Sequence, residues 1–320
     1  IKITGVFQYT IKVKNMKILV TGGSGFIGSF IVDQLAKDKK NQIQIFDIAP
    51  PNYKIGDNVR YIDGDICYKT AIDKAIVDCE EVYDCAGVLG TSELVFQTER
   101  AIDTNIKGAF NVIQSCLENS VKRIFHPTKP FFKTYWENTY TISKITAENF
   151  ARMYREVYNM DLTILRWLNA SGPRQHLFPV RKFIPLAICN ALLDRDIEIY
   201  GTGGQTIDII DVRDIANIAI VSTRSGIGKD KKVYDVGAGQ ALTCNFVAEK
   251  IIRMTNSKSK IKYLPMRVGE ALNTKIVAVN HEELFKKLNF NLNFNYEQTL
   301  IDSIEFYKSL GKDYLIKSSN

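Results

Sequence analysis

Two residues four positions apart, Tyr140 and Lys144, are the pair in this sequence best suited to acid–base chemistry. On a helix they share one face, so the ammonium group can lie near the phenol oxygen. A phenol with an ordinary pKa of about 10 is a poor base at neutral pH, and lowering that pKa to about 7 takes roughly 4 kcal/mol of preferential stabilisation of the phenolate. A nearby ammonium group can contribute to this. The spacing is also common on surface helices, so the pair needs support from other parts of the chain.

A glycine-rich stretch near the start, residues 17–28, is the second region whose residue types indicate chemistry. An apolar run is followed at once by glycines and then by the apolar spacing of an amphipathic helix, which predicts a strand, a tight turn and a helix. Glycines let the backbone approach a diphosphate, and the helix would direct its first N–H groups at that diphosphate. The residues that fit this motif are Gly22, Gly23, Gly25, Phe26, Ile27 and Gly28.

An acidic residue, Asp47, follows a second apolar run at 43–46. It lies at about the distance after the glycines where a carboxylate meets an adenosine ribose. A carboxylate there accepts hydrogen bonds from both ribose hydroxyls and repels a 2′-phosphate, so the sequence predicts NAD rather than NADP as the cofactor. The alternative is an ordinary tight turn with an unrelated aspartate.

Length and composition exclude several classes of protein. The 320 residues are enough for a nucleotide-binding domain and a smaller second domain, and 45% hydrophobic with 24% charged residues is typical of a soluble globular protein. The net charge of +7 suits anionic ligands, but the lysines are scattered, so we expect no nucleic-acid partner. No stretch approaches the roughly 18 apolar residues of a membrane-spanning helix, so we expect no membrane partner.

The cysteines and the first residues bear on the cellular setting. Six cysteines lie far apart without a C-x-x-C pair, and only three histidines are present, so we expect neither a metal site nor a disulfide framework. Free thiols favour a cytoplasmic location. The first residues lack the features of a secretory signal. Met16 is the expected start, which makes residues 1–15 a leader, a cloning remnant or an extra strand.

Strand patterns that alternate with helix patterns predict an α/β fold with a doubly wound parallel sheet, the Rossmann arrangement. Residues 16–170 would form this NAD-binding domain, with residues 206–237 returning to it. A smaller C-terminal α/β substrate domain would comprise residues 171–205 and 238–320. Parallel sheets bind ligands at the carboxyl ends of their strands. The residues expected there, besides the glycines, are Asp47, Asp65, Ala86, Gly87 and Thr128.

Most of the chain, from Met16 to about Lys308, resembles the extended short-chain dehydrogenase/reductase family of nucleotide-sugar epimerases and dehydratases, of which UDP-glucose 4-epimerase is the best-known type. The resemblance rests on motifs that are specific for the family and much less specific for a substrate. These motifs are residues 21–28, Asp47, residues 64–66, Asn105, Tyr140 with Lys144, and residues 165–174, 201–208 and 267–270.

The resemblance implies a role for each matching residue. Tyr140 would be the general base and later the general acid, while Lys144 would bind the nicotinamide ribose and lower the pKa of Tyr140. Thr128 would hydrogen-bond the reacting hydroxyl, unless it is an ordinary loop threonine. Asp65 and Ile66 would hold the adenine. Further contacts with NAD would come from Gly22, Gly25, Phe26, Ile27, Gly28, Asp47, Ala86, Gly87 and Asn105.

The same resemblance places two residues against a nucleotide-diphosphate sugar. Asn169 would contact this substrate, and Arg267 would pair with its diphosphate through charge-assisted hydrogen bonds. The alternatives are a turn or cap residue for Asn169 and a surface ion pair for Arg267. Two departures affect substrate binding, because Ile207 replaces a common arginine and Ser171 a common tyrosine. Arg213 or Arg267 would have to compensate for the lost arginine.

The residues after Thr128 help to choose the reaction. The 4,6-dehydratases of this family need an Asp-Glu pair here and its decarboxylases a nearby glutamate, whereas this chain has Lys129 and Pro130. An epimerase needs only Tyr140, the threonine and a reversible hydride acceptor. By elimination we predict an NAD-dependent nucleotide-sugar epimerase that oxidises the sugar transiently, at C4.

Two other functions stay open at this point. One is an NAD-dependent dehydrogenase or reductase acting on a sugar or alcohol, which would release NADH. The other is a non-catalytic dinucleotide sensor or scaffold, although a sensor needs neither Tyr140 nor Lys144. The resemblance also implies a homodimer, in which long helices predicted at 98–118 and 139–158 pair with their copies as a four-helix bundle.

Overall fold

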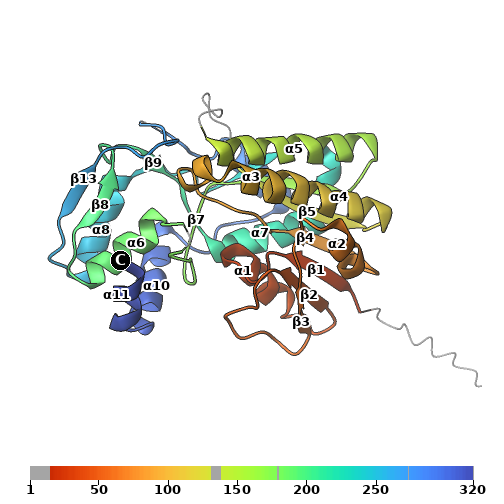
Figure 1. Ribbon diagram of the computed structural model, residues 1–320, viewed down its shortest axis with the longest axis horizontal. Helices are drawn as coiled ribbons and strands as arrows, with labels where there is room; N and C mark the ends of the chain where they lie inside the picture. The colour runs from red at the N-terminus through yellow and green to blue at the C-terminus, as the bar shows by residue number, and fades with distance from the viewer. Residues whose placement is uncertain (1–14, 131–137, 179, 273, 320) are drawn as a thin grey trace, which may run out of the picture.

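The computed structural model describes residues 15–130, 138–178, 180–272 and 274–319. The expectation for the first residues therefore falls almost wholly outside the described part. Figure 1 shows two groups of elements side by side: a large sheet with helices on both faces, and a smaller group of short strands and helices from the C-terminal half. The predicted smaller C-terminal domain corresponds to this second group.

The large sheet has seven parallel strands in the order β11-β6-β5-β4-β1-β2-β3. This order confirms the doubly wound sheet, because the chain starts near the middle and winds outward in both directions. The apolar run of β1 is fully buried, as expected for a central parallel strand. The strands are β1 (Lys17–Thr21), β2 (Gln42–Asp47), β3 (Val59–Asp63), β4 (Glu81–Asp84), β5 (Arg123–Thr128), β6 (Leu162–Trp167) and β11 (Tyr234–Val236).

Helices cover both faces of this sheet and enclose two cores. Alternate side chains of β1 serve the two faces, since Ile18 and Val20 pack into one core and Leu19 into the other. The first core is covered by α1 (Phe26–Leu35) and α7 (Val212–Arg224), and the second by α2 (Lys69–Ile76), α4 (Ala109–Glu118) and α5 (Thr139–Val157).

The long helix predicted at 98–118 is not one regular α-helix. It consists of α3 (Thr98–Ala101), a π-helical stretch at Ile102–Gly108, and α4. Asn105 lies within the π-helical stretch and is buried. π-Helical turns are frequent at functional sites. The apolar periodicity fitted 3.6 residues per turn on both sides of this stretch, so it could not show the wider turn.

The smaller group of elements encloses a third core, which includes Ile188, Val247 and Ile304. Among the described residues, five helices and three pairs of short strands contribute to this part of the chain or lie beside it. The helices are α6 (Phe183–Leu192), α8 (Cys244–Thr255), α9 (His281–Leu288), α10 (Tyr296–Ser309) and α11 (Lys312–Ser319), with 3₁₀ turns at Glu93–Phe96 and Ile227–Asp230. The paired strands are β7 (Asn169–Ser171) with β10 (Ile209–Asp211), β8 (Ile197–Tyr200) with β13 (Ile261–Leu264), and β9 (Thr206–Ile207) with β12 (Leu242–Thr243).

Parts of the C-terminal half pack with the large sheet. The edge strand β11 belongs to that sheet, and α7 lies against α1. Leu284 of α9 shares a core with Ile18 of β1. The chain therefore crosses between the two groups of elements more than once.

None of the helices in the described ranges is both long and apolar enough to cross a bilayer.

Candidate active site

The glycine turn after β1 leaves no room for side chains. Gly22 has φ +65°, and a Cβ on it would lie 2.6 Å from the Ala86 backbone nitrogen. A Cβ on Gly28 would overlap the Gly22 carbonyl oxygen. The N–H of Gly25 donates to the same carbonyl oxygen at 3.0 Å. Since α1 begins directly after Gly25 without a side-chain cap, its first N–H groups can bind a diphosphate.

Asp47 ends β2 beside this turn. Its carboxylate accepts hydrogen bonds from the backbone N–H groups of Ser24, at 3.0 Å, and Ala49, at 3.3 Å. Burial raises the pKa of Asp47, and these backbone hydrogen bonds act in the opposite direction. The carboxylate is thus held at the edge of the glycine turn, where the ribose of a dinucleotide is expected. The turn and Asp47 together fit NAD.

The residues predicted at the adenine follow β3. The Asp65 carboxylate accepts a hydrogen bond from the Cys67 N–H at 2.8 Å. Ile66 is buried, and its carbonyl oxygen accepts a hydrogen bond from the Asn111 side chain at 2.9 Å. These bonds fix the loop after β3, next to the loop that follows β2.

Asn105 connects the segment after β4 with helix α5. Its side chain exchanges two hydrogen bonds of 2.9 Å with the Val88 backbone. It also donates to the Ser143 hydroxyl at 3.0 Å. Ser143 lies on α5, in the turn that begins at Tyr140. The π-helical stretch therefore directs Asn105 at the backbone and the helix that border the site.

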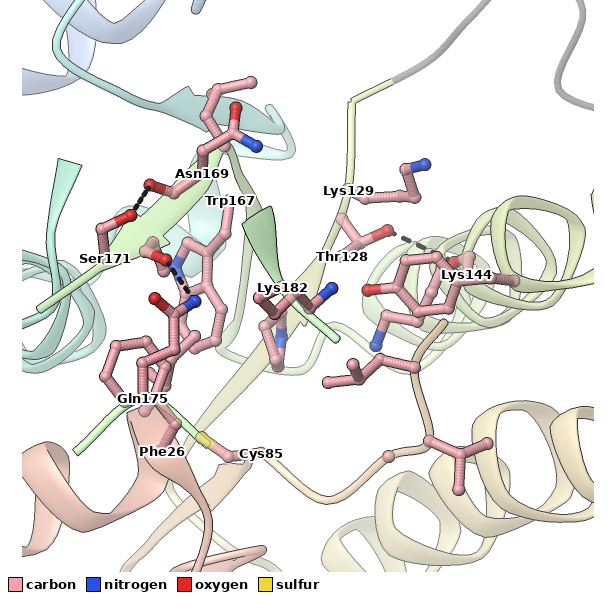
Figure 2. Close-up of a pocket in the computed structure, with 18 of the residues that line it drawn as sticks. Phe26, Cys85, Thr128, Lys129, Lys144, Trp167, Asn169, Ser171, Gln175 and Lys182 are labelled. Atoms are coloured by element: carbon pink, nitrogen blue, oxygen red, sulfur yellow. Dashed lines mark hydrogen bonds between the residues drawn. The ribbon is translucent and has the colours of Figure 1, made fainter. Parts of the chain in front are cut away.

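One cavity of about 280 Å³ brings the three predicted catalytic residues together (Figure 2). Tyr140 and Lys144 lie one turn apart on α5, which is capped by the Asn138 side chain accepting from the Thr141 N–H at 2.8 Å. Thr128 ends β5, and its hydroxyl donates to the Lys144 carbonyl oxygen at 3.3 Å. The prolines on either side of Thr128 do not remove it from this cavity.

Other predicted residues divide into two groups around the cavity. Those that line it are Phe26, Ile27, Ala86, Gly87, Asn105 and Asn169, together with the departures Ile207 and Ser171. Those that lie outside its lining are Gly22, Gly25, Gly28, Asp47, Asp65, Ile66 and Arg267. The predicted cofactor residues therefore extend from the cavity along the strand ends toward β3, as an elongated dinucleotide requires.

Burial acts against the proposed base. It raises the pKa of Tyr140 to about 12. It also lowers the pKa of Lys144, while the charges of Asp84 and Glu148 act in the opposite direction. A phenolate at neutral pH must therefore gain enough from nearby positive charge to overcome its own desolvation.

The two arginines expected to bind the diphosphate both form ion pairs with protein carboxylates. Arg267 pairs with Glu93, at 3.3 Å, and with Glu270. Arg213 pairs with Asp211, at 2.7 Å, and with a second aspartate on α10. Asn169 is exposed at the cavity, and its side-chain oxygen accepts a hydrogen bond from the backbone N–H that follows Ile207.

The cavity also contains residues for which no binding or catalytic role was predicted. The indole N–H of Trp167 is buried and has no hydrogen-bond partner among the described residues. The Lys129 amino group donates to the Thr141 hydroxyl at 2.8 Å and lies 5.3 Å from the centre of the Tyr140 ring. Lys182, just before α6, reaches the same cavity. It lies in an irregular stretch without a motif, so only tertiary packing reveals it.

Comparison with known proteins agrees with this geometry. The model of the NAD dependent epimerase/dehydratase family matches residues 18–237. The chain belongs to this family. It is an enzyme family that uses NAD, and both the glycine turn and Asp47 fit that cofactor. The seven-stranded sheet with a smaller C-terminal domain is the fold expected of such an enzyme.

Family members similar to this chain catalyse different reactions. UDP-N-acetyl-alpha-D-glucosaminuronate decarboxylase of Bacillus cytotoxicus is 25% identical, over 93% of this chain and 99% of the relative. A dTDP-glucose 4,6-dehydratase of Actinoplanes is 24% identical, over 92% and 98%. The structure of UDP-N-acetylglucosamine 4-epimerase from Methanobrevibacter ruminantium, in complex with UDP-N-acetylmuramic acid, has a TM-score of 0.80 and 27% identity, covering 93% of this chain and all of that one.

Proposed function

We propose that this protein is an NAD-dependent nucleotide-sugar 4-epimerase. Bound NAD would supply a reversible hydride acceptor. Tyr140 would take the proton of the sugar hydroxyl while the carbon is oxidised to a ketone, and would return a proton after the ketone has turned over in the site. Thr128 would hydrogen-bond the same oxygen, and Lys144 would bind the nicotinamide ribose. The product would be an isomer of the substrate.

One observation carries the choice of reaction. Among the described residues that line the cavity, none is an aspartate or a glutamate. Dehydratases and decarboxylases of this family use carboxyl side chains at the sugar, whereas here Thr128 is followed by Lys129 and Pro130. An epimerase needs no such carboxyl group, because one residue, Tyr140, both removes and returns the proton.

We assign the cofactor to residues 16–170 and 206–237 and the substrate to residues 171–205 and 238–320. The place of β11 in the large sheet supports the return of the middle segment. The nucleoside diphosphate would lie near Asn169. Arg267 would reach it by exchanging one of its carboxylate partners for phosphate oxygens.

We also propose a homodimer formed through α4 and α5. Their outer faces expose the apolar side chains of Phe110, Ile142, Phe150 and Met153, each 37–40% exposed. The Phe110 and Phe150 rings meet edge to face at 6.3 Å. Such a face on two adjacent helices favours a helix bundle between two subunits. Sedimentation should show a dimer that Phe150→Glu dissociates, and a monomeric wild type would contradict this.

Mass spectrometry of the purified protein tests the proposed reaction. Denaturation should release NAD, and incubation with UDP-, GDP- and dTDP-sugars should give an isomer of equal mass that is lost in Tyr140→Phe. A product lighter by water or by CO₂ would instead identify a dehydratase or a decarboxylase. Accumulating NADH would identify a dehydrogenase, and bound NAD without any product would favour a sensor.

A further inference from the structure

The cavity carries more positive charge than epimerisation uses. Lys129, Lys144 and Lys182 all line it, and none of the described lining residues is acidic. Lys144 already has a role at the nicotinamide ribose and at Tyr140. The proposed reaction gives the other two ammonium groups nothing to do.

Lys182 is the clearer of the two. Its side chain extends into the cavity, between Trp167 and Lys144 in the view of Figure 2. Within the described residues, no hydrogen bond or ion pair holds its amino group. The nearby carboxylates, Glu93 and Glu270, are paired with Arg267. Burial lowers the pKa of Lys182, because a buried ammonium group loses its hydration, while the charges of Glu93 and Glu270 act in the opposite direction. An anion in the cavity would relieve that penalty.

Lys129 places a second amino group at the reacting end. It follows Thr128 directly, and its amino group lies over the Tyr140 ring. Burial, together with the charge of Lys182, lowers the pKa of Lys129 to about 7. The two lysines are therefore close enough to affect each other, and an anion that contacts both would remove their repulsion.

We propose that Lys182, together with Lys129, binds a carboxylate on the sugar, so that the substrate is a nucleoside diphosphate linked to an acidic sugar. This rests on the proposed epimerase function and adds the class of sugar to it. Lys129 lies at the sugar because it contacts the helix turn of Tyr140, which would meet the reacting hydroxyl, and Lys182 lines the same cavity. The diphosphate has candidates of its own in Asn169 and Arg267.

Calorimetric titration of the NAD-loaded protein tests this with two matched pairs of ligands. UDP-glucose and UDP-glucuronate differ only in a hydroxymethyl or carboxylate group, as do GDP-mannose and GDP-mannuronate. In the pair whose nucleotide is accepted, we expect the acidic sugar to bind at least about tenfold more tightly. Lys182→Met should abolish this preference without changing the affinity for the neutral sugar or for the free nucleoside diphosphate. Lys182→Arg should retain it.

The controls separate this inference from the proposed function. Lys37→Met removes an exposed lysine outside the cavity and should behave like the wild type. If the wild type binds both members of a pair with equal affinity, the acidic-sugar inference is wrong, while the proposed epimerase function is unaffected. An equal loss of sugar and free-diphosphate binding in Lys182→Met would overturn it too, because the lysine would then bind the diphosphate. If no UDP-, GDP- or dTDP-sugar binds, the proposed function itself fails.

Discussion

The end of the site that fits NAD, called the cofactor end, and the end proposed to bind the sugar, called the sugar end, are built in different ways. At the cofactor end, backbone geometry determines which residues fit, because a Cβ on Gly22 or on Gly28 would meet main-chain atoms. At the sugar end, the shape and charge of the cavity depend on side chains from β5, from α5 and from the irregular stretch before α6. The glycine turn of the cofactor end lies within a dozen consecutive residues, 17–28, whereas the sugar end has no such continuous motif.

This contrast indicates which end can change during evolution or design. A side chain added to the glycine turn clashes with a backbone that the central strand holds in place. A lysine exchanged at the sugar end changes the charge in the cavity and leaves the backbone where it was. Substrate preference can therefore vary while the cofactor stays the same, as the different reactions of the related proteins illustrate.

The largest expected effect is at the sugar end. Tyr140→Phe keeps the ring and removes the only hydroxyl proposed to move protons, so turnover should fall by about 10³-fold. The NAD content of the purified variant should match that of the wild type, since the ring still packs at the same place. Steady-state isomerisation assays check this, and a variant with near-normal turnover would remove Tyr140 from the mechanism.

The glycine turn offers a matched pair for the cofactor end. Gly22 and Gly226 both have left-handed backbone, at φ +65° and +77°, but nothing lies within 4 Å of a Cβ on Gly226. Gly22→Ala should raise the Kd for NAD about 30-fold, since overpacking costs about 2 kcal/mol. Gly226→Ala shares the backbone strain and should leave the Kd for NAD unchanged. Fluorescence titration with NAD measures the Kd of both variants. An equal rise in Kd would show that backbone strain, and not the close approach of Gly22 to the Ala86 backbone, weakens NAD binding.

A substitution at Asp47 tests whether a side-chain charge contributes to NAD binding at the cofactor end. Asp47→Asn should weaken NAD binding about tenfold, because a hydrogen bond to a charged group is lost. It should also narrow the preference for NAD over NADP, since the repulsion of a 2′-phosphate disappears. Competitive titration with the two cofactors gives both numbers. A wild type that prefers NADP would contradict the role of this carboxylate.

The smallest effect concerns the cap of the helix that carries Tyr140. Asn138→Ala should lower the free energy of unfolding by about 1 kcal/mol. Asn295 caps α10, where its side chain accepts from the Gln298 N–H at 2.9 Å, so Asn295→Ala should lose a similar amount. Only Asn138→Ala should also change KM and kcat, because α5 borders the cavity. Urea unfolding and steady-state kinetics of both variants measure this difference, and equal kinetics would mean that the cap does not position Tyr140.

The large sheet and the glycine turn with Asp47 could be predicted from local patterns in the sequence. Apolar runs followed by glycines or acids are local patterns, and the order of strands in a doubly wound sheet follows from right-handed crossovers. The glycine turn and Asp47 were predicted for the same reason, since their geometry depends on a few neighbouring residues. The spacing of Tyr140 and Lys144, the pair proposed to be catalytic, was also visible in the sequence, because a helix places residues four apart on one face.

The composition of the sugar end depends on contacts between distant residues and could not be predicted from the sequence. In the π-helical stretch that directs Asn105, the helix departs locally from its regular period. Gly108 of this stretch packs against Ile66 in the loop after β3. The ion pairs of Arg267 and the arrival of Lys182 in the cavity join residues far apart in the sequence. No sequence motif predicts such contacts. The role of a single lysine in an irregular stretch depends on its burial and on the charges beside it. Those are properties of the folded chain.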